Sequence, residues 1–179
     1  MTIGLFANSQ SWPVGDRIMK VAHAGEHGAV QIYRGQLLGA ALTARDWRPL
    51  LGEFAAHERT HRAIFAAELQ RRGRPRCSSY WLCGLGGWVL GAVTGLLGRR
   101  AIAATTVAVE RTVLAHLAEY RAMLAGRDEA GHAAISAILA DEQAHHDALA
   151  KDANGIAARW VDAAVSASTH AVIRIGMRL

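Results

Sequence analysis

Apolar residues recur three and four positions apart over most of the 179-residue chain, which is the spacing of amphipathic α-helices. The pattern predicts four long helices and a C-terminal one, over residues 15–42, 47–72, 100–125, 129–151 and 155–178. Asp46 is placed to cap the second helix, Gly126 to end the third and Asp128 to begin the fourth. With only three prolines, the chain is predicted to be all-α.

The segment between the second and third helices has a different composition. Residues 80–98, "YWLCGLGGWVLGAVTGLLG", carry no charge and include six glycines, which should weaken a regular helix. Nineteen uncharged residues approach the ~20 that span a bilayer. One span would put the two halves of the chain on opposite sides of a membrane, so we expect a short helix or hairpin that dips into one leaflet. A buried crossover is the alternative. The flanking groups expected at lipid headgroups are Arg71, Arg72, Arg74, Arg76, Tyr80, Trp81, Trp88, Arg99 and Arg100.

Each of the four long helices carries an acidic residue on its apolar stripe. The stripes are Met19, Ala22, Glu26, Ala29 and Tyr33; Leu51, Phe54, Glu58, His61 and Phe65; Ala103, Thr106, Glu110, Val113 and Leu117; and Ile135, Ile138, Glu142, His145 and Leu149. Two of them contain Glu-x-x-His. These charged groups are therefore predicted to face the core.

The spacing of these acids shows that the two halves of the chain match. Glu26 and Glu58 lie 32 residues apart (58 − 26), as do Glu110 and Glu142 (142 − 110). The midpoints, residues 42 and 126, fall at the two predicted turns. In antiparallel hairpins, residues equally far from the turn lie level, so all four acids are predicted at one level of a shared core.

Four ionised carboxylates buried together need compensating positive charge. Two divalent cations would supply it, and a carboxylate and imidazole ligand set favours iron or manganese. One Glu from each of two helices and Glu-x-x-His from each of the other two is the ligand set of ferritin-like dinuclear proteins. The predicted metal ligands are Glu26, Glu58, His61, Glu110, Glu142 and His145.

The remaining chemistry is less specific. Cys77 and Cys83 match neither a zinc nor a redox spacing, which favours a reduced intracellular compartment. The first residues lack the pattern of a secretory signal. The net charge of +5 suggests an anionic partner, but no nucleic-acid recognition motif is visible. Among the other histidines, which are expected at the surface or hydrogen-bonded in the core, only His116 and His146 are candidates to support the ligands.

Several motifs together resemble the demethoxyubiquinone hydroxylase family of ubiquinone biosynthesis. They are "HAGEHGAVQIYRGQ" (23–36), "HERTH" (57–61), "TVAVE" (106–110), "DEQAHHD" (141–147) and "GWVLGAVTGLLG" before the third helix. The resemblance runs from about residue 17 to the C-terminus, and it implies the same six residues as iron ligands. This chain departs from the family at His27, where members usually have Tyr, and near Leu117, where a Tyr is frequent.

The resemblance implies a single ferritin-like di-iron domain over 1–179, a four-helix bundle with a hydrophobic crossover and an additional C-terminal helix. It also implies a monooxygenase that hydroxylates the ring of demethoxyubiquinone or its quinol with dioxygen, two Fe ions and electrons ultimately from NADH, which is not tightly bound. The enzyme would be a peripheral protein at the membrane surface, on the cytoplasmic face of the inner membrane in a bacterium.

Two other classes are alternatives: another ferritin-like di-iron oxidase or peroxidase, and a non-catalytic quinone- or lipid-binding helical bundle. The sequence leaves open the isoprenoid tail length, the electron donor, a helper protein that presents the lipid, and a homo-oligomer formed through the apolar segment or the last helix.

Overall fold

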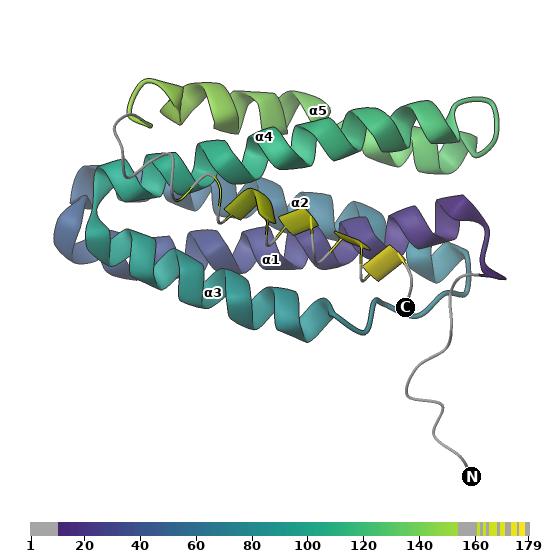
Figure 1. Cartoon of the computed structure of the whole chain (residues 1–179), viewed down its shortest axis with the longest axis horizontal. Helices are drawn as coiled ribbons and strands as arrows, with labels where there is room; N and C mark the ends of the chain where they lie inside the picture. The colour runs from purple at the N-terminus through teal and green to yellow at the C-terminus, as the bar shows by residue number, and fades with distance from the viewer. Residues whose placement is uncertain are drawn as a thin grey trace, which may run out of the picture.

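The computed structural model of the chain describes residues 11–153, together with residues 161, 163, 165–167, 169–170, 173–174 and 176–177. The described residues form helices and no strand (Figure 1). The elements are α1 (Val14–Thr43), the short 3-10 helix η2 (Arg45–Trp47), α2 (Arg48–Arg71), α3 (Tyr80–Leu97), α4 (Arg99–Leu124) and α5 (Glu129–Ala150). The predicted all-α helical bundle is thereby confirmed.

The four long helices begin and end within one residue of their predicted limits. Asp128 caps α5 by accepting a hydrogen bond from the backbone N–H of Gly131, and Gly126 follows α4 with a φ of 66°, as predicted. The predicted cap at Asp46 is wrong. Because residues 45–47 form η2, α2 begins after Asp46, and the Asp46 carboxylate pairs with Arg99 instead.

The C-terminal helix predicted over 155–178 is confirmed only at its described positions, which are helical. Val161 and Val165 pack with Ile32 of α1 and Val109 of α4. The prediction also placed four more apolar residues on this helix, and they lie outside the described residues: Ile156, Trp160, Val172 and Ile175. The single domain over 1–179 stays a prediction.

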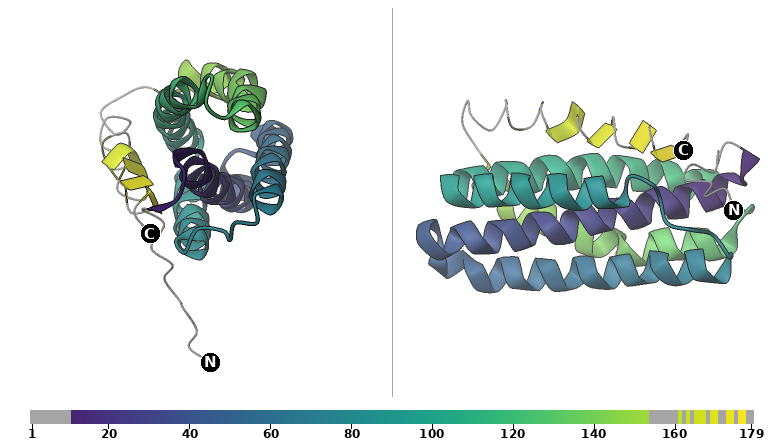
Figure 2. Two further views of the ribbon diagram at one scale, coloured as in Figure 1. Left: turned by 90° about the vertical axis from the view of Figure 1, so that its right-hand side faces the viewer. Right: turned by 90° about the horizontal axis from the view of Figure 1, so that it is seen from below.

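The helices form two antiparallel hairpins, α1–α2 and α4–α5, joined by α3. The end view shows α1 enclosed by α2, α3 and α4 (Figure 2). Arg72, after α2, contacts Asp16 and Asp128 at the starts of α1 and α5, whereas Arg99, at the start of α4, contacts Asp46 at the opposite end. The chain must therefore travel the length of the bundle between α2 and α4, and α3 makes this crossing.

Glycines let α3 pack closely against α1. A Cβ on Gly87 would meet the backbone of Gly28, and one on Gly95 would meet Gln36 and Gly39. The residue numbers rise together, so the two helices are parallel. Despite its glycines, α3 is one continuous helix of 18 residues, so the segment is a helix and not a hairpin, and its buried glycines form the contact. The close backbone approach compensates for their low helix propensity.

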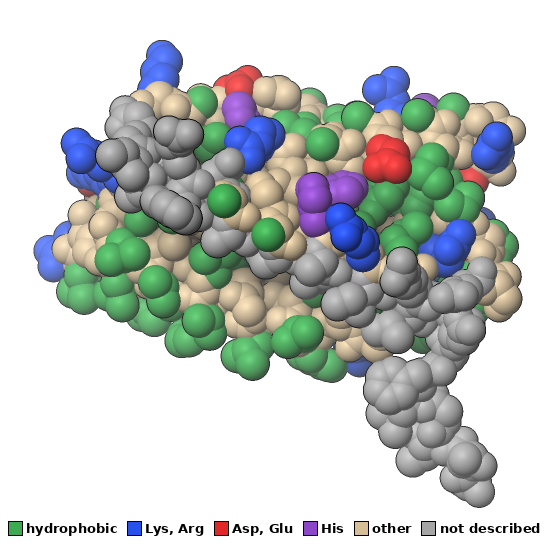
Figure 3. Space-filling view, in the orientation of Figure 1, with side chains coloured by type: hydrophobic (Ala, Val, Ile, Leu, Met, Phe, Trp, Pro, Cys, Tyr) green, Lys and Arg blue, Asp and Glu red, His purple; other side chains and the backbone are tan. Residues whose placement is uncertain are grey.

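The opposite face of α3 is apolar and exposed. Its large exposed side chains are Trp81, Leu82, Leu85, Trp88, Val89, Val93, Leu96 and Leu97. Hydrophobic side chains line the lower edge of the molecule in the space-filling view, where α3 runs (Figure 3). By length and composition both α3 and α4 could cross a membrane, but core helices of soluble proteins pass the same test, and α4 is the more buried of the two.

The residues that flank α3 only partly match their predicted role at lipid headgroups. The prediction for Arg72 is wrong, because its guanidinium is nearly buried and forms salt bridges with Asp16, Glu68 and Asp128. The prediction for Tyr80 is also wrong, because this side chain is buried and its ring stacks on His27. These contacts tie the start of α3 to α1 and leave Trp81, near the start, and Trp88, in the middle, as the exposed aromatic residues of this helix.

We expect Gly91→Ala to destabilise the fold by about 2 kcal/mol, the usual cost of overpacking. The added methyl group would collide with the backbone carbonyl of Ile32 and separate α3 from α1. Gly86→Ala on the same helix is the matched control, since nothing lies within 4 Å of its added Cβ. This control should gain up to about 1 kcal/mol from helix propensity. Denaturant unfolding measures both, and equal effects would contradict the close packing.

Arg72→Gln should lower the free energy of unfolding by about 2 kcal/mol at pH 7, because three carboxylates lose their shared cation. The hydrogen bond from Arg72 lowers the pKa of Asp128 below its usual 3.8. This contribution is therefore present above pH 3.8 and is lost as the pH falls through the folded value. The difference from wild type should shrink in acid. Arg71→Gln, which removes only an exposed pair with Glu68, should lower the free energy of unfolding much less than Arg72→Gln does.

Candidate metal centre

The bundle brings all six predicted ligands together at one level of its core. Glu26 comes from α1, Glu58 and His61 from α2, Glu110 from α4, and Glu142 and His145 from α5. Glu26 is 5% exposed and each of the others 1%. Each lies on the apolar stripe of its helix, so the packing that buries the stripes also buries the polar groups.

Ligand atoms form two groups that share two glutamates. Glu26, Glu58, His61 and Glu142 make one group, in which these atoms lie within 4.8 Å of one another, and Glu58, Glu110, Glu142 and His145 make the other. The Nδ1 atom of His61 is 3.0 Å from Glu142 Oε1, and that of His145 is 3.2 Å from Glu58 Oε1. Glu58 and Glu142 thus belong to both groups and could contribute ligand atoms to each of two cations.

The polar atoms of the cluster are poorly satisfied by the protein alone. Both carboxylate oxygens of Glu58 and of Glu142, and the Nδ1 atoms of His61 and His145, are buried without a hydrogen-bond partner. Orphaned buried groups of this kind are rare unless another species completes them. Two divalent cations would bond these atoms and balance four carboxylates, so the residues fit a dinuclear metal centre.

Without metal, the carboxylates must hold protons or pair with protonated imidazoles. Burial, and then the charge of neighbouring glutamates, raises the pKa of Glu26 and of Glu110 well above the usual range. Burial alone would lower the pKa of His61, but Glu142 and Glu58 outweigh it and raise this pKa to about 10. Metal binding should therefore release protons.

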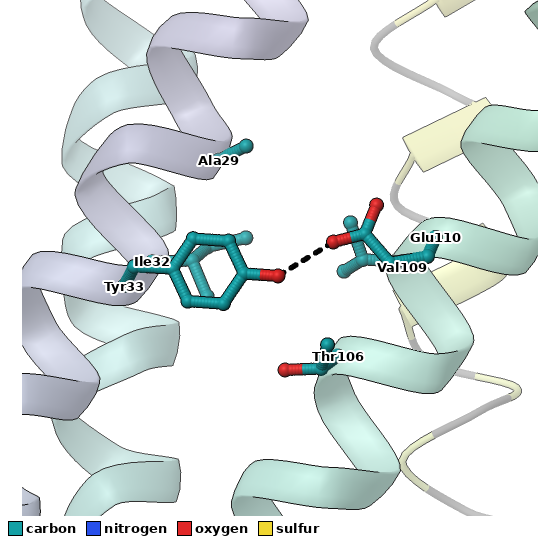
Figure 4. Close-up of a pocket in the computed structure, with 6 residues that line it drawn as sticks. All are labelled: Ala29, Ile32, Tyr33, Thr106, Val109 and Glu110. Carbon is teal, nitrogen blue, oxygen red and sulfur yellow. Dashed lines mark hydrogen bonds between the residues drawn. The ribbon is translucent and has the colours of Figure 1, made fainter. Parts of the chain in front are cut away.

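A second layer of side chains holds the ligands in place. Each histidine faces the carboxylates through Nδ1, so a metal-binding neutral imidazole carries its proton on Nε2. The Nε2 of His61 lies 3.0 Å from Asp141 Oδ2, and that of His145 lies 3.0 Å from His57 Nδ1. Tyr33 donates a hydrogen bond of 2.6 Å to Glu110 Oε1 (Figure 4). These contacts fix ring orientation and tautomer.

The side chains that support the ligands are not the ones predicted from the sequence. His116 and His146 do not reach the ligands: His116 Nε2 is 3.3 Å from His170 Nδ1, and His146 Nδ1 is 2.9 Å from Asp147. His57 contacts a ligand instead, although it was assigned no role. The available signal was its position immediately before Glu58, which matches that of Asp141 before Glu142.

His27 packs outside the cluster, between α1 and α3. Its ring stacks on Tyr80 with centroids 3.9 Å apart and planes 7° apart. A side chain at Gly84 would collide with it. At this position, where the resembling family usually has Tyr, the chain therefore has an aromatic contact between two helices.

The α1–α4 interface leaves a narrow space beside Glu110 (Figure 4). Ala29, Ile32 and Val109 form apolar walls, and the buried hydroxyl of Thr106 has no hydrogen-bond partner. The space is too narrow to hold a water molecule in this structure. It places apolar side chains directly beside the Glu110 carboxylate.

Comparisons with known proteins agree with the resemblance seen in the sequence. The chain is 42% identical over 103 residues to the "NADPH-dependent 3-demethoxyubiquinone 3-hydroxylase, mitochondrial" of Dictyostelium discoideum, covering 56% of this chain and 46% of that protein. It is 37% identical over 134 residues to the "3-demethoxyubiquinol 3-hydroxylase" of Rhodospirillum rubrum, covering 74% and 62%. The chain thus spans about half to three-fifths of these relatives.

A mouse protein named like the Dictyostelium one is 34% identical over 137 residues, with 74% of this chain and 62% of that protein covered. The family model described as "Ubiquinone biosynthesis protein COQ7" matches residues 14–176. This match includes all four helices of the bundle, α3 and the whole ligand cluster. The chain therefore belongs to the COQ7 family of ubiquinone biosynthesis proteins.

Proposed function

We propose that the cluster holds two iron ions and that the protein is a di-iron monooxygenase. Glu26 and His61 would help to hold one ion and Glu110 and His145 the other, while Glu58 and Glu142, which belong to both groups, would contribute to holding both. The observation that carries the proposal is the convergence of four carboxylates and two imidazoles in the core. Buried atoms of Glu58, Glu142, His61 and His145 lack hydrogen-bond partners there. Carboxylate and imidazole ligands suit iron.

The bound metals would supply the activation of dioxygen, and the chain's own residues do the rest. Burial of the ligands keeps bulk water away from the centre. Asp141 and His57 hold the imidazoles in the tautomer that presents Nδ1 to the ions, and Tyr33 orients Glu110. The side chains beside Glu110 are apolar, so a ring would reach the cluster there only if α1 and α4 move apart.

The proposed substrate is the ring of demethoxyubiquinone or demethoxyubiquinol, which the printed names of the relatives specify for those proteins. Dioxygen would be the oxidant. The sequence-based prediction named NADH as the ultimate reductant, whereas relatives are named NADPH-dependent. A reduced nicotinamide as the electron source is common to both and is the form proposed here.

A membrane surface would supply this lipid substrate. The exposed apolar face of α3 is the feature that supports membrane contact, and eukaryotic relatives are named as mitochondrial. We propose peripheral attachment through α3, on the cytoplasmic face of the inner membrane in a bacterium. A helper protein that presents the lipid, and a homo-oligomer, stay predictions from the sequence. Neither alternative class, a soluble ferritin-like oxidase or a non-catalytic binding bundle, accounts for both α3 and the ligand cluster.

Replacing Glu110 with Gln tests the metal centre. The substitution should maintain or raise the stability of the metal-free protein and should reduce the stability that iron adds. The metal-free variant should be at least as stable as metal-free wild type, because an amide replaces a buried carboxyl group whose ionisation is opposed by burial and by neighbouring glutamates. With Fe(II) at about 100 times Kd, wild type should gain about 3 kcal/mol, and the variant much less. Glu119→Gln, an exposed position on the same helix, should behave as wild type. Thermal unfolding and iron content measure the effect. Equal gains in all three proteins would rule out these ligands.

The reaction is tested in cells that lack their own hydroxylase. Cells expressing this chain should convert accumulated demethoxyubiquinone to the hydroxylated quinone, measured by mass spectrometry of lipid extracts. The Glu142→Ala variant should lose at least a hundredfold in product, because both metal positions lose a shared ligand. Folded, iron-loaded wild-type protein that yields no product would exclude the proposed substrate.

A further inference from the structure

The ligand cluster has an internal two-fold relation with an offset of 84 residues. Glu26 corresponds to Glu110 (110 − 26), Glu58 to Glu142 (142 − 58) and His61 to His145 (145 − 61). The two ligand groups are therefore equivalent in residue type and in helix position. Any difference between them must come from the residues that contact the ligands, and the same offset identifies the pairs to compare.

The two ligand groups differ first in the side chain that contacts the Nε2 atom of the histidine. The offset relates His57 to Asp141 (141 − 57), and each contacts the histidine of the opposite hairpin. His61 Nε2 faces the carboxylate of Asp141, whereas His145 Nε2 faces the Nδ1 atom of another imidazole, that of His57. A hydrogen bond to an ionised acceptor is roughly twice as strong as one to a neutral acceptor. The stronger bond draws the proton from the ring and makes the Nδ1 of His61 the better electron donor.

The two ligand groups differ secondly in the side chain that can donate a hydrogen bond to Glu26 or Glu110. Tyr33 corresponds to Leu117 (117 − 33), and both are buried. The Tyr33 hydroxyl donates to Glu110 at 2.6 Å, which withdraws charge from that carboxylate and occupies one of its lone pairs. The apolar side chain of Leu117 cannot donate to Glu26 in this way. Glu26 therefore keeps more of its charge for a cation.

Both differences act in the same direction. In the Glu26–His61 group, no tyrosine equivalent to Tyr33 donates to the carboxylate, and the imidazole contacts the carboxylate of Asp141. The Glu110–His145 group combines a carboxylate that accepts a bond from Tyr33 with an imidazole backed by His57. The bridging residues Glu58 and Glu142 belong to both groups and cannot offset the difference.

We propose that the two metal positions are unequal, so that the Glu26–His61 position fills first and binds its ion more tightly than the Glu110–His145 position. His57 and Asp141 are positioning residues that set this order. The inference rests on the proposed dinuclear centre. Loss of one such outer hydrogen-bond partner usually changes metal affinity by about 10- to 100-fold, so we expect the two affinities to differ by about tenfold.

Titration of the full, metal-stripped chain with Mn(II) tests the order of filling without any assay of activity. Low-temperature electron paramagnetic resonance distinguishes an isolated Mn(II) ion from a coupled pair. Wild type should give a binding curve with two affinities about tenfold apart, with isolated Mn(II) in excess over the coupled pair at one equivalent. A single affinity shared by both positions would overturn the inference and leave the dinuclear centre intact. No binding of Mn(II) at all would overturn both.

Two variants should move the affinities in opposite directions. Asp141→Asn should weaken the tighter position about tenfold, and His57→Asp should tighten the weaker one about tenfold, so both bring the two values together. Asp147→Asn, an exposed position on α5 that bonds Gln143 and His146, is the matched control and should keep the wild-type gap. Helical circular dichroism of each stripped variant checks folding. Unchanged affinities in both folded variants would contradict the assigned roles.

Discussion

The mutual repulsion of four carboxylates buried at one level is the constraint on which this structure depends. Hydrophobic packing of the stripes forces Glu26, Glu58, Glu110 and Glu142 into the core, where each loses its hydration. The raised pKa of Glu26 and of Glu110 expresses this cost in the metal-free protein. Metal ions relieve it, so the feature that would destabilise an ordinary bundle becomes the source of affinity for the proposed centre.

Bringing these acids together also dictates the topology. The helices α2 and α4 run in the same direction, so their connection must cross the whole bundle, and the 18 residues of α3 span about 27 Å at 1.5 Å per residue. A crossing helix adds a layer against α1. Glycines on both helices allow the backbones of α1 and α3 to approach closely. The outward face of α3 is apolar and exposed.

The sequence predicts the helices and the ligand set well because both follow from periodicity. Residues at equal distances from a turn must lie level in a hairpin, and this geometry places Glu26 beside Glu58 without knowledge of the fold. Periodicity cannot predict side-chain partners between distant helices. Arg72 therefore looked like a surface cation, although it joins Asp16 and Asp128 from other helices, and His57 looked unremarkable until His145 was found 3.0 Å away.

Helix α1 connects the two functional faces of the protein. One side carries Glu26 and Tyr33 toward the ligand cluster, and another carries Gly28, Gly35 and Gly39 against α3. Packed helices usually lie 8–10 Å apart, and small residues permit a closer approach. Under the proposed function, a lipid at the α3 surface would therefore be separated from the metal centre by little more than two helix layers. The glycines would then serve the reaction as well as the packing, because larger residues there would move the membrane-facing surface away from the centre.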